Sequence, residues 1–310
     1  MLAGNIESVS LNNRYLPVHP PRLGMLKVSR RQRSLTVALP GSLTRDIPHL
    51  REKTARIGLI GRSLAIFKVS RAIIYRDEPS QKGIVEAALL EKILRFQETP
   101  QYLRRHLFKL EPDLQFTGTL PPLRIPSHPN RADASPGQIR EAVVISSGSA
   151  SKADAGYGQP VTIRASLAMK RRITVRINRT RPTLEGELVE ANGLRIYWGF
   201  RVNREDVSLA ELVKKKDQDL TISTSRKGKD IRDTMEEFKP RWKSSQHPLL
   251  LFGSPDKGVP ELLTESGTRV EDAADFNLNM IPEQGVETVR TEEALMASLA
   301  VLNILDKEDA

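Results

Sequence analysis

Glycines occur at three places in the last third of the sequence where short apolar segments end, and this arrangement can form a ligand site. Gly228, Gly253 with Gly258, and Gly285 follow three such segments. In an α/β sheet, ligands bind beyond the carboxyl ends of the strands, and a residue without Cβ lets the backbone approach them closely. Each glycine by itself is also typical of an ordinary turn. Three such loops side by side can wrap an adenosine in backbone N–H and C=O groups.

Other kinds of chemical site lack their usual residues. No Gly-x-Gly-x-x-Gly follows a strand and there is no P-loop, which argues against a Rossmann-type methyltransferase or dehydrogenase. The chain has no cysteine, so disulfides and thiolate metal sites are excluded. Its five histidines are scattered without the spacing of metal ligands. We therefore expect no metal site.

The stretch from residue 275 to 305 contains three successive elements. Phe276, Leu278 and Met280 alternate with two asparagines, which is the period-2 pattern of a strand. A loop with a proline and a glycine follows at residues 281–289, and Thr291 can then cap a helix. From residue 294 to 305 the helix contains only two polar residues, Ser298 and Asn303. A helix that is apolar on all sides is buried on all sides.

Three segments resemble a known family. Residues 281–285 (IPEQG) followed by residues 287–294 (ETVRTEEA) resemble the knot loop of SPOUT-class RNA methyltransferases, and in particular the archaeal and eukaryotic subfamily with an inserted OB-like barrel. Residues 219–228 (DLTISTSRKG) and 249–253 (LLLFG) resemble the first and second cofactor segments of that family. The resemblance extends from about residue 34 to the C-terminus. It implies an α/β fold, a trefoil-knotted SPOUT methyltransferase domain interrupted by a small OB-like β-barrel.

The resemblance also implies a function: methyl transfer from S-adenosylmethionine to a nucleotide in structured RNA, with ribosomal RNA as the expected substrate. Carried over position by position, it places these residues at the cofactor: Thr224, Arg226, Gly253, Asn279, Ile281, Gln284, Gly285 and Val289. Since the methyl donor is already activated as a sulfonium, the protein has to position the acceptor and manage its charge.

Three residues are candidates for that catalytic work. Arg226 can polarise a carbonyl or bind a phosphate, and Arg290 and Glu292 stand where the knot loop meets the last helix. Each has a plainer alternative. Glu292 can serve only the dipole of the helix, and Arg290 can serve only to pair with it.

The elements that must position these residues follow an α/β rhythm that is interrupted once. Strands are predicted at residues 35–39 and 70–75 and a helix at 50–67, and a proline-rich segment at 121–136 marks a boundary. Five short strands, at 141–146, 161–165, 173–178, 183–189 and 195–202, then predict a small barrel. Strands at 220–223, 248–252 and 276–280 resume the first pattern. The predicted domains are a methyltransferase domain in two parts, 34–130 and 204–310, with the barrel at 131–203 inserted.

Charge is distributed unevenly along the chain. The net charge is +10, but residues 255–310 contain 13 acidic and four basic residues, so the first 254 residues carry +19. Seven basic residues and no acid lie between Arg164 and Arg181. A basic barrel face suits RNA, and a solvated face is the plain alternative. The predicted RNA-binding residues are Arg164, Lys170, Arg171, Arg172, Arg176 and Arg179.

The ends of the chain and its partners complete the expectations. Residues 1–33 are predicted to be a basic, flexible tail, with an RNA-binding arm or a nuclear signal as the alternatives. No apolar run reaches the length of a membrane span and the N-terminus lacks the apolar core of a signal peptide, so a soluble intracellular protein of the cytoplasm or nucleus is expected. The last helix has two apolar stripes, which predicts a homodimer. A ribosome assembly factor that binds RNA with little chemistry is the rival to the enzyme.

Overall fold

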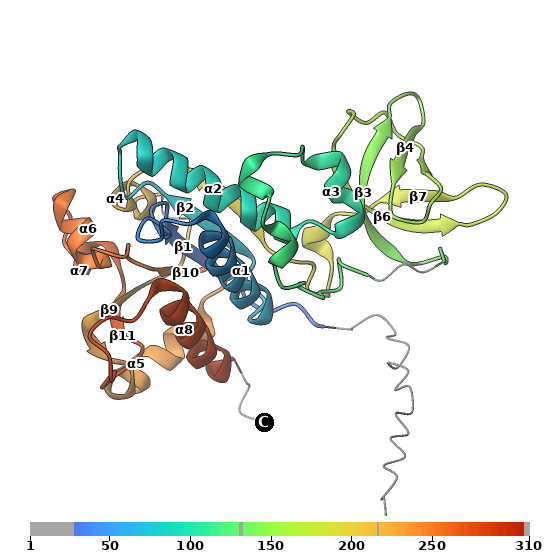
Figure 1. Cartoon of the computed structure of the whole chain (residues 1–310). Helices are drawn as coiled ribbons and strands as arrows, with labels where there is room; N and C mark the ends of the chain where they lie inside the picture. Colours follow the sequence, from blue (N-terminus) through green and yellow to red (C-terminus); the bar gives the residue numbers. More distant parts are fainter. Residues whose placement is uncertain (1–27, 130–132, 216, 307–310) are drawn as a thin grey trace, which may run out of the picture.

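The chain was studied as a computed structural model that describes residues 28–129, 133–215 and 217–306. A six-stranded sheet of parallel strands lies at its centre, in the order β11-β9-β10-β1-β2-β8. A separate closed barrel is formed by β3, β4, β5, β7 and β6. Figure 1 shows the barrel at one end of the molecule, with β9 and β11 towards the other end. The predicted mixture of an α/β layer and a small barrel is therefore confirmed.

The sheet comprises β1 (Thr36–Pro40), β2 (Arg71–Tyr75), β8 (Arg201–Glu205), β9 (Leu220–Asp230), β10 (Pro248–Leu251) and β11 (Phe276–Asn279). Apolar side chains alternate between its two faces because the strand period is two. Val37 and Leu39 of β1 belong to the core on one face, and Ala38 belongs to the core on the other. Both faces are therefore covered, as parallel sheets require.

Helices cover the two faces of the sheet. The first face packs against α1 (Leu50–Ile66), α2 (Gln81–Glu98), α5 (Ile231–Ser244) and α8 (Thr291–Leu305). The second packs against α4 (Leu209–Val213), α6 (Val259–Glu265) and α7 (Val270–Ala273). Between α2 and the barrel the chain forms α3 (Gln101–Leu107) and two short 3-10 turns, η1 (Pro112–Leu114) and η2 (Thr117–Thr119). None of the helices within the described ranges is long and apolar enough to cross a membrane.

The barrel strands are β3 (Ile139–Ser146), β4 (Ser151–Asp154), β5 (Val161–Ile163), β6 (Arg172–Arg179) and β7 (Glu185–Leu188), and a 3-10 turn, η3 (Ala191–Gly193), follows them. Ile173, Val175 and Ile177 of β6 point into the barrel core, as their spacing predicts. The strand predicted at 195–202 is wrong, because the fifth barrel strand is the unpredicted β4. The chain from residue 201 instead forms β8, which pairs with β2 in the large sheet. The boundary predicted after residue 203 therefore falls inside a strand.

Most of the predicted N-terminal tail lies outside the described residues, but residues 28–33 are packed against the large domain. Arg31 and Arg33 are buried, and both guanidinium groups lie beside the carboxylate of Asp306, which ends α8 (Arg31 Nη1 to Oδ2, 3.1 Å; Arg33 Nε to Oδ1, 3.6 Å). Arg33 also lies over the ring of Trp242, 4.8 Å from its centroid. These six residues belong to the folded domain, so the prediction of a tail as far as residue 33 is wrong for them.

Candidate active site

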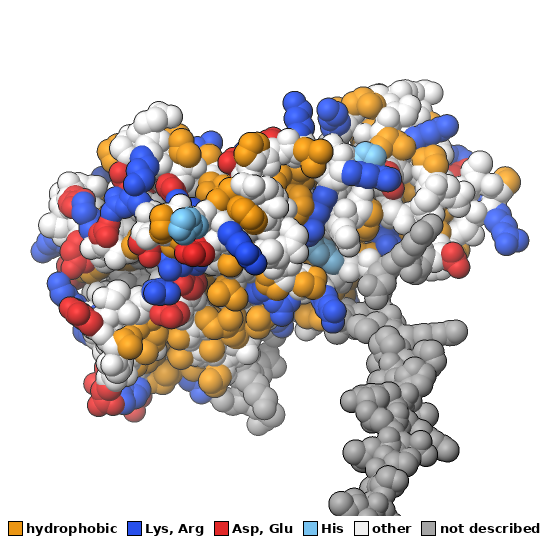
Figure 2. All heavy atoms as spheres, viewed as in Figure 1, with side chains coloured by type: hydrophobic (Ala, Val, Ile, Leu, Met, Phe, Trp, Pro, Cys, Tyr) orange, Lys and Arg blue, Asp and Glu red, His pale blue; other side chains and the backbone are white. Residues whose placement is uncertain are grey.

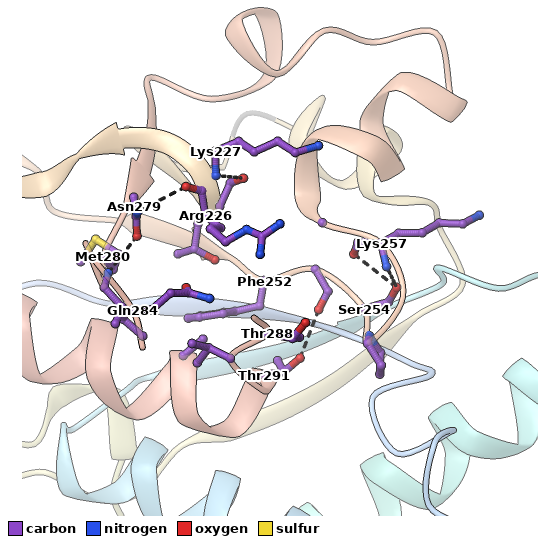
Figure 3. A pocket seen from close by; sticks show the side chains of 18 of the residues that line it. Arg226, Lys227, Phe252, Ser254, Lys257, Asn279, Met280, Gln284, Thr288 and Thr291 are labelled. Carbon is purple, nitrogen blue, oxygen red and sulfur yellow. Dashed lines mark hydrogen bonds between the residues drawn. The ribbon is translucent and has the colours of Figure 1, made fainter. Parts of the chain in front are cut away.

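A cavity of about 320 Å³ opens at the carboxyl ends of β9, β10 and β11. Figure 3 shows side chains from three segments pointing towards it: Arg226 from β9, Phe252 and Ser254 from the loop after β10, and Gln284 from the loop after β11. The first turns of α8 close it from below. The volume lies at the lower end of the range for small-molecule sites, roughly 300–1,000 Å³. This is the position predicted from the three glycine-containing loops.

An irregularity in β9 supplies the first wall. Asn277 of β11 pairs with Ser223, but the next residue, Leu278, pairs with Lys229. The five residues between, 224–228, therefore leave the ladder with β11 and are free to line the cavity. Gly228 permits the return to the ladder, because a Cβ at this position would lie 2.6 Å from the backbone carbon of Leu278.

A tight turn after β10 supplies the second wall. The backbone N–H of Ser254 donates to the carbonyl of Lys257 at 2.8 Å. A Cβ on Gly253 would lie 2.6 Å from that same carbonyl oxygen and 2.8 Å from the Cα of Gly258. Glycine is required here because the turn folds back on itself, so Gly253 shapes the wall of the cavity. Arg45, from the loop after β1, pairs with both Glu78 and Asp256 and so holds the turn against the neighbouring strands.

The loop at residues 280–289 supplies the third wall and is tied to the first. Arg226 donates from Nη1 to the carbonyl oxygen of Glu287 at 2.5 Å. Asn279 donates from Nδ2 to the carbonyl oxygen of Arg226 at 3.2 Å, and its Oδ1 accepts the N–H of Ile281 at 3.1 Å. Gln284 donates to the carbonyl oxygens of Val286 (2.8 Å) and Glu287 (3.1 Å). Side chains thus fix a loop that has no regular structure.

Cations and carboxylates share the rim of the cavity. Lys227 pairs with Glu261 at 3.0 Å, and this hydrogen bond lowers the pKa of the Glu261 carboxyl below its usual value. Asp256 pairs with Arg45. Among the described residues, Glu287 is the lining carboxylate whose side chain makes no ion pair. No group of three or more His, Asp or Glu side chains able to hold a metal ion occurs in the described parts of the chain.

The structure brings seven of the eight predicted cofactor residues to this cavity: Thr224, Arg226, Gly253, Asn279, Ile281, Gln284 and Val289. Gly285 is the exception. It is exposed, it does not line the cavity, and a Cβ built on it would meet no atom within 4 Å. Gly285 therefore lies on the outer side of the loop, and the space it leaves is solvent.

The three predicted catalytic residues are separated. Arg226 lines the cavity, whereas Arg290 is exposed and precedes α8 as its N-cap residue. Glu292 lies outside the cavity lining, and its Oε1 is 3.1 Å from Nε of Arg56 on α1. This ion pair joins α8 to α1, and it is neither of the two roles predicted for Glu292. Thr291, predicted to be the cap, is instead the first residue of the helix.

Several lining residues were not predicted as site residues, among them Phe252, Met280, Glu287 and Ser298. Ser298 is the most informative. It is 1% exposed, and its hydroxyl oxygen has no hydrogen-bond partner. Its sequence signal was that Ser298 is one of only two polar residues between residues 294 and 305. Buried polar groups are almost always hydrogen-bonded, so this hydroxyl is an exception beside the cavity.

The predicted RNA-binding residues of the barrel fall into two groups. Lys170 and Arg171 are exposed, and no ion pair is formed by either side chain within the described residues. Arg164 and Arg179 pair with Glu185, and Arg176 pairs with Glu187. The three arginine side chains are between 45% and 81% exposed. The pairs are therefore weak and open to competition by phosphate.

Arg172 departs from this predicted set. Its guanidinium donates two hydrogen bonds to Glu98 of α2 (2.6 and 2.9 Å) and one to Glu141 of β3 (2.7 Å). Its donors are committed to carboxylates, so Arg172 joins the barrel to the large domain and we remove it from the RNA-contact set.

A parallel sheet covered by helices, with a polar cavity at the carboxyl ends of its strands, is the arrangement found in ligand-binding α/β proteins. A family model described as "Putative RNA methyltransferase" matches residues 34–302 of this chain. The chain belongs to this family of RNA methyltransferases.

Individual relatives agree with the family. An uncharacterized protein of Haloarcula marismortui is 31% identical over 286 residues, with 87% of this chain and 99% of the relative covered. A 28S rRNA (uridine-N(3))-methyltransferase of Homo sapiens is 31% identical over 300 residues, covering 87% of this chain and 77% of the relative. The mouse protein of the same description is also 31% identical, covering 87% of this chain and 76% of the relative.

Proposed function

We propose that this RNA methyltransferase uses S-adenosylmethionine to methylate N3 of a uridine in ribosomal RNA. The observation that carries the proposal is the cavity at the carboxyl ends of β9, β10 and β11, in a chain of this family. The acceptor atom is suggested by the printed activity of the human, mouse and Drosophila melanogaster relatives, all named 28S rRNA (uridine-N(3))-methyltransferases. The plainer assembly factor is less favoured, since the relatives are named as enzymes.

The cavity suits this cofactor in size and in the groups it presents. Phe252, Met280 and Ile281 offer apolar surface for an adenine ring, and backbone groups of the loop after β11 offer hydrogen bonds. The unpartnered hydroxyl of Ser298 offers another. When bound, S-adenosylmethionine supplies an electrophilic methyl group on a sulfonium. The protein residues then have to orient the acceptor and take up its proton.

A uridine acceptor sets a definite task, because N3 carries a proton at neutral pH that must leave as the N–C bond forms. Arg226 lines the cavity and can stabilise negative charge on the carbonyl oxygens that flank N3. We assign the uptake of the proton to the carboxylate of Glu287, the lining acid with no ion pair in the described residues. Arg290 and Glu292 receive no role in the reaction.

Substrate RNA is expected to contact the barrel through Lys170 and Arg171, with Arg164, Arg176 and Arg179 as further contacts once their glutamate pairs open.

The threading of residues 281–290 as a trefoil knot is part of the proposal. The motif of residues 281–294 supports it, because it resembles the knot loop of SPOUT-class methyltransferases. The division at residues 34–130, 131–203 and 204–310 remains a prediction, with the second boundary moved to precede β8.

A homodimer is also proposed, since apolar side chains of α1 and α8 remain exposed in the single chain. Leu59, Ile66 and Ile304 are 54%, 48% and 73% exposed. A two-fold partner would cover them.

Two measurements test the proposed activity. Calorimetry with S-adenosylmethionine is expected to give one site per chain, and RNA from a strain lacking the gene is expected to accept a labelled methyl group at one uridine. Binding of the cofactor without transfer to any RNA would favour the assembly factor. Absence of cofactor binding by the folded protein would refute the enzyme as proposed.

A further inference from the structure

A second hollow, which we call the interdomain groove, lies between the edge strand β8 of the large sheet and strand β6 of the barrel. It has a volume of about 630 Å³. One wall is formed by β8 and α2, the other by the start of β6, and the buried rings of Tyr197, Trp198 and Phe200 lie beneath them. The brace from Arg172 to Glu98 and Glu141 crosses it, so the two walls are held at a fixed separation. The groove is therefore built into the fold.

The groove carries an excess of positive charge. Its lining includes five arginines and three glutamates, Glu91, Glu98 and Glu141. Arg172 engages two of these acids, and Glu91 is shared between Arg95 (3.2 Å) and Arg204 (3.1 Å). The groove therefore has more cationic groups than its own carboxylates can neutralise.

Two of the arginines have no acid at all in the described part of the chain. Arg30 donates to the backbone oxygen of Asn192 at 2.6 Å, and Arg201 donates to the side-chain oxygen of the same residue at 2.8 Å. Both guanidinium groups keep further donors, since each carries five N–H groups in a planar fork. Asn192 thus holds two cations in place without cancelling their charge.

The positive surface continues out of the groove onto the barrel. Lys170 and Arg171 directly precede Arg172, which lines the groove, and consecutive Cα atoms are only about 3.8 Å apart. Neither side chain makes an ion pair in the described residues, and the same is true of Lys152, Arg181 and Arg195 within residues 133–200. The glutamate-paired arginines, Arg176 and Arg179, lie towards the other end of β6. Two of the unpaired cations of the barrel therefore lie within two residues of the groove lining.

We propose that the interdomain groove binds the sugar–phosphate backbone of the substrate RNA, through Arg201 and Arg204 of β8 together with Arg30 and Arg95. This inference rests on the proposed function for the identity of the polyanion. Guanidinium groups match phosphate in shape and charge, and contacts of this kind fix the register of a nucleic acid on a protein. The groove positions the RNA, whereas the cavity beyond β9 performs the chemistry.

A peptide strand added to the free edge of β8 is the alternative occupant, and the side chains disfavour it. Arg201, Asn203 and Arg204 are all exposed on this five-residue strand. Short edge strands with charged side chains are a common protection against strand pairing.

The test uses full-length Arg201→Ala/Arg204→Ala protein and a fluorescein-labelled RNA stem-loop with a uridine-rich loop, without methyl donor. Fluorescence anisotropy at rising NaCl concentration is expected to show weaker binding and a salt slope reduced by roughly 0.7–0.9 for each lost phosphate contact. The matched control is Arg241→Ala/Arg269→Ala, which removes two exposed arginines that pair with Asp275 and Asp272 elsewhere on the large domain. It is expected to behave as wild type.

Equal affinity and slope in the groove variant and the control would overturn the proposal, as would weaker binding with an unchanged salt slope. Thermal unfolding of both variants checks that each is folded. Calorimetry with S-adenosylmethionine on the same variants separates the two proposals. A groove variant that loses RNA affinity but binds S-adenosylmethionine normally supports the groove proposal. A wild-type protein that fails to bind S-adenosylmethionine refutes the proposed function, and the RNA-binding measurement remains valid.

Discussion

The hydroxyl of Ser298 differs from comparable hydroxyls in the other helices. Thr54, Ser63 and Thr234 each donate to the carbonyl oxygen four residues earlier, at 2.8–2.9 Å. That local bond is the usual solution for a hydroxyl inside a helix. Ser298 makes no such bond although it is almost fully buried, and it lines the cavity. The helix therefore has an unused polar group beside the cavity.

We expect Ser298→Ala to weaken binding of S-adenosylmethionine roughly fivefold, the equivalent of about 1 kcal/mol for one hydrogen bond. The free energy of unfolding without ligand should stay equal or rise, because the unsatisfied hydroxyl is replaced by hydrogen. Calorimetry and urea denaturation measure the two quantities. Ser63→Ala, which removes a hydroxyl already bonded to Leu59, is the control for cofactor binding. A variant with wild-type affinity would show that the hydroxyl does not touch the ligand.

A buried histidine predicts how stability depends on pH. Burial lowers the pKa of His128 to about 4, although its Nε2 lies 2.6 Å from the carbonyl oxygen of Glu98. In the unfolded chain His128 takes up a proton below about pH 6.5, whereas in the folded chain it stays neutral down to about pH 4. Stability is therefore lost as the pH falls from about 6.5 to 4, by up to about 3 kcal/mol.

Urea denaturation across that pH range measures the loss. His128→Gln keeps an N–H donor for the Glu98 carbonyl and removes the titration, so its unfolding free energy should depend less steeply on pH. Identical pH profiles for the two proteins would contradict the assignment.

At the scale of elements, Arg172 is the residue that joins two separately folded parts. It lies at the start of β6, and its partners lie on α2 and β3. Burial raises the pKa of Glu98 above its usual value even with this arginine beside it. Glu98 consequently depends on Arg172 for compensation of its charge. The same contact helps to attach the barrel, together with the contacts of Arg105 and His106 on α3 with Asp154 on β4.

Removal of this brace should destabilise the protein far more than removal of a surface pair. Arg172→Ala leaves a buried carboxylate uncompensated, which costs about 3 kcal/mol or more. Arg176→Ala, which breaks an exposed pair with Glu187, should change the free energy of unfolding by less than about 1 kcal/mol. Arg172→Lys should recover part of the loss, because lysine keeps the charge but not the fork geometry. Urea denaturation measures the free energy of unfolding of the three variants. Equal losses of stability in all three would contradict the proposed role of the Arg172–Glu98 contact.

Regular patterns made much of the fold predictable, and irregular ones did not. The helix predicted at residues 50–67 is α1, and the alternation at 173–177 is β6. The strand β4 has the sequence SKAD and β8 has RVNRE, and neither contains an apolar alternation strong enough to mark a strand. The aromatic residues just before β8 looked like strand residues, but they form the base of the interdomain groove.

The site was predictable where a motif carried it and not where distant contacts decided it. The cavity loops follow the order of the quoted motifs, so seven of the eight residues predicted at the cofactor line it. Arg172 looked like part of a basic face because its partner Glu98 is 74 residues away in the chain. Glu292 looked catalytic for the same reason, as its partner Arg56 lies on another helix. Neither pairing leaves a trace in local sequence.

For the molecule as a whole, the last helix was expected to be buried on all sides, and in the single chain it is not. Leu295, Leu299 and Leu302 are fully buried in the core, as predicted for one stripe. On the other predicted stripe Met296 and Val301 are half-buried and Leu305 is buried. Ile304, which belongs to neither predicted stripe, is 73% exposed. Figure 2 shows hydrophobic side chains gathered over α8 on this face. Exposed apolar patches of this kind mark interaction sites.

We therefore expect a homodimer through α1 and α8, and Ile304→Glu is the sharpest probe of it. Since Ile304 makes little contact within its own chain, the substitution should leave the fold intact, whereas Val301→Glu would also disturb the core against which Val301 packs. A glutamate buried in a two-fold interface lacks a partner and costs several kcal/mol. Light scattering at micromolar concentration should report a dimer for the wild type and a monomer for the variant. Leu110→Glu, at a residue fully exposed after α3, should remain dimeric. A monomeric wild type would refute the interface and leave the exposed stripe of α8 to another partner.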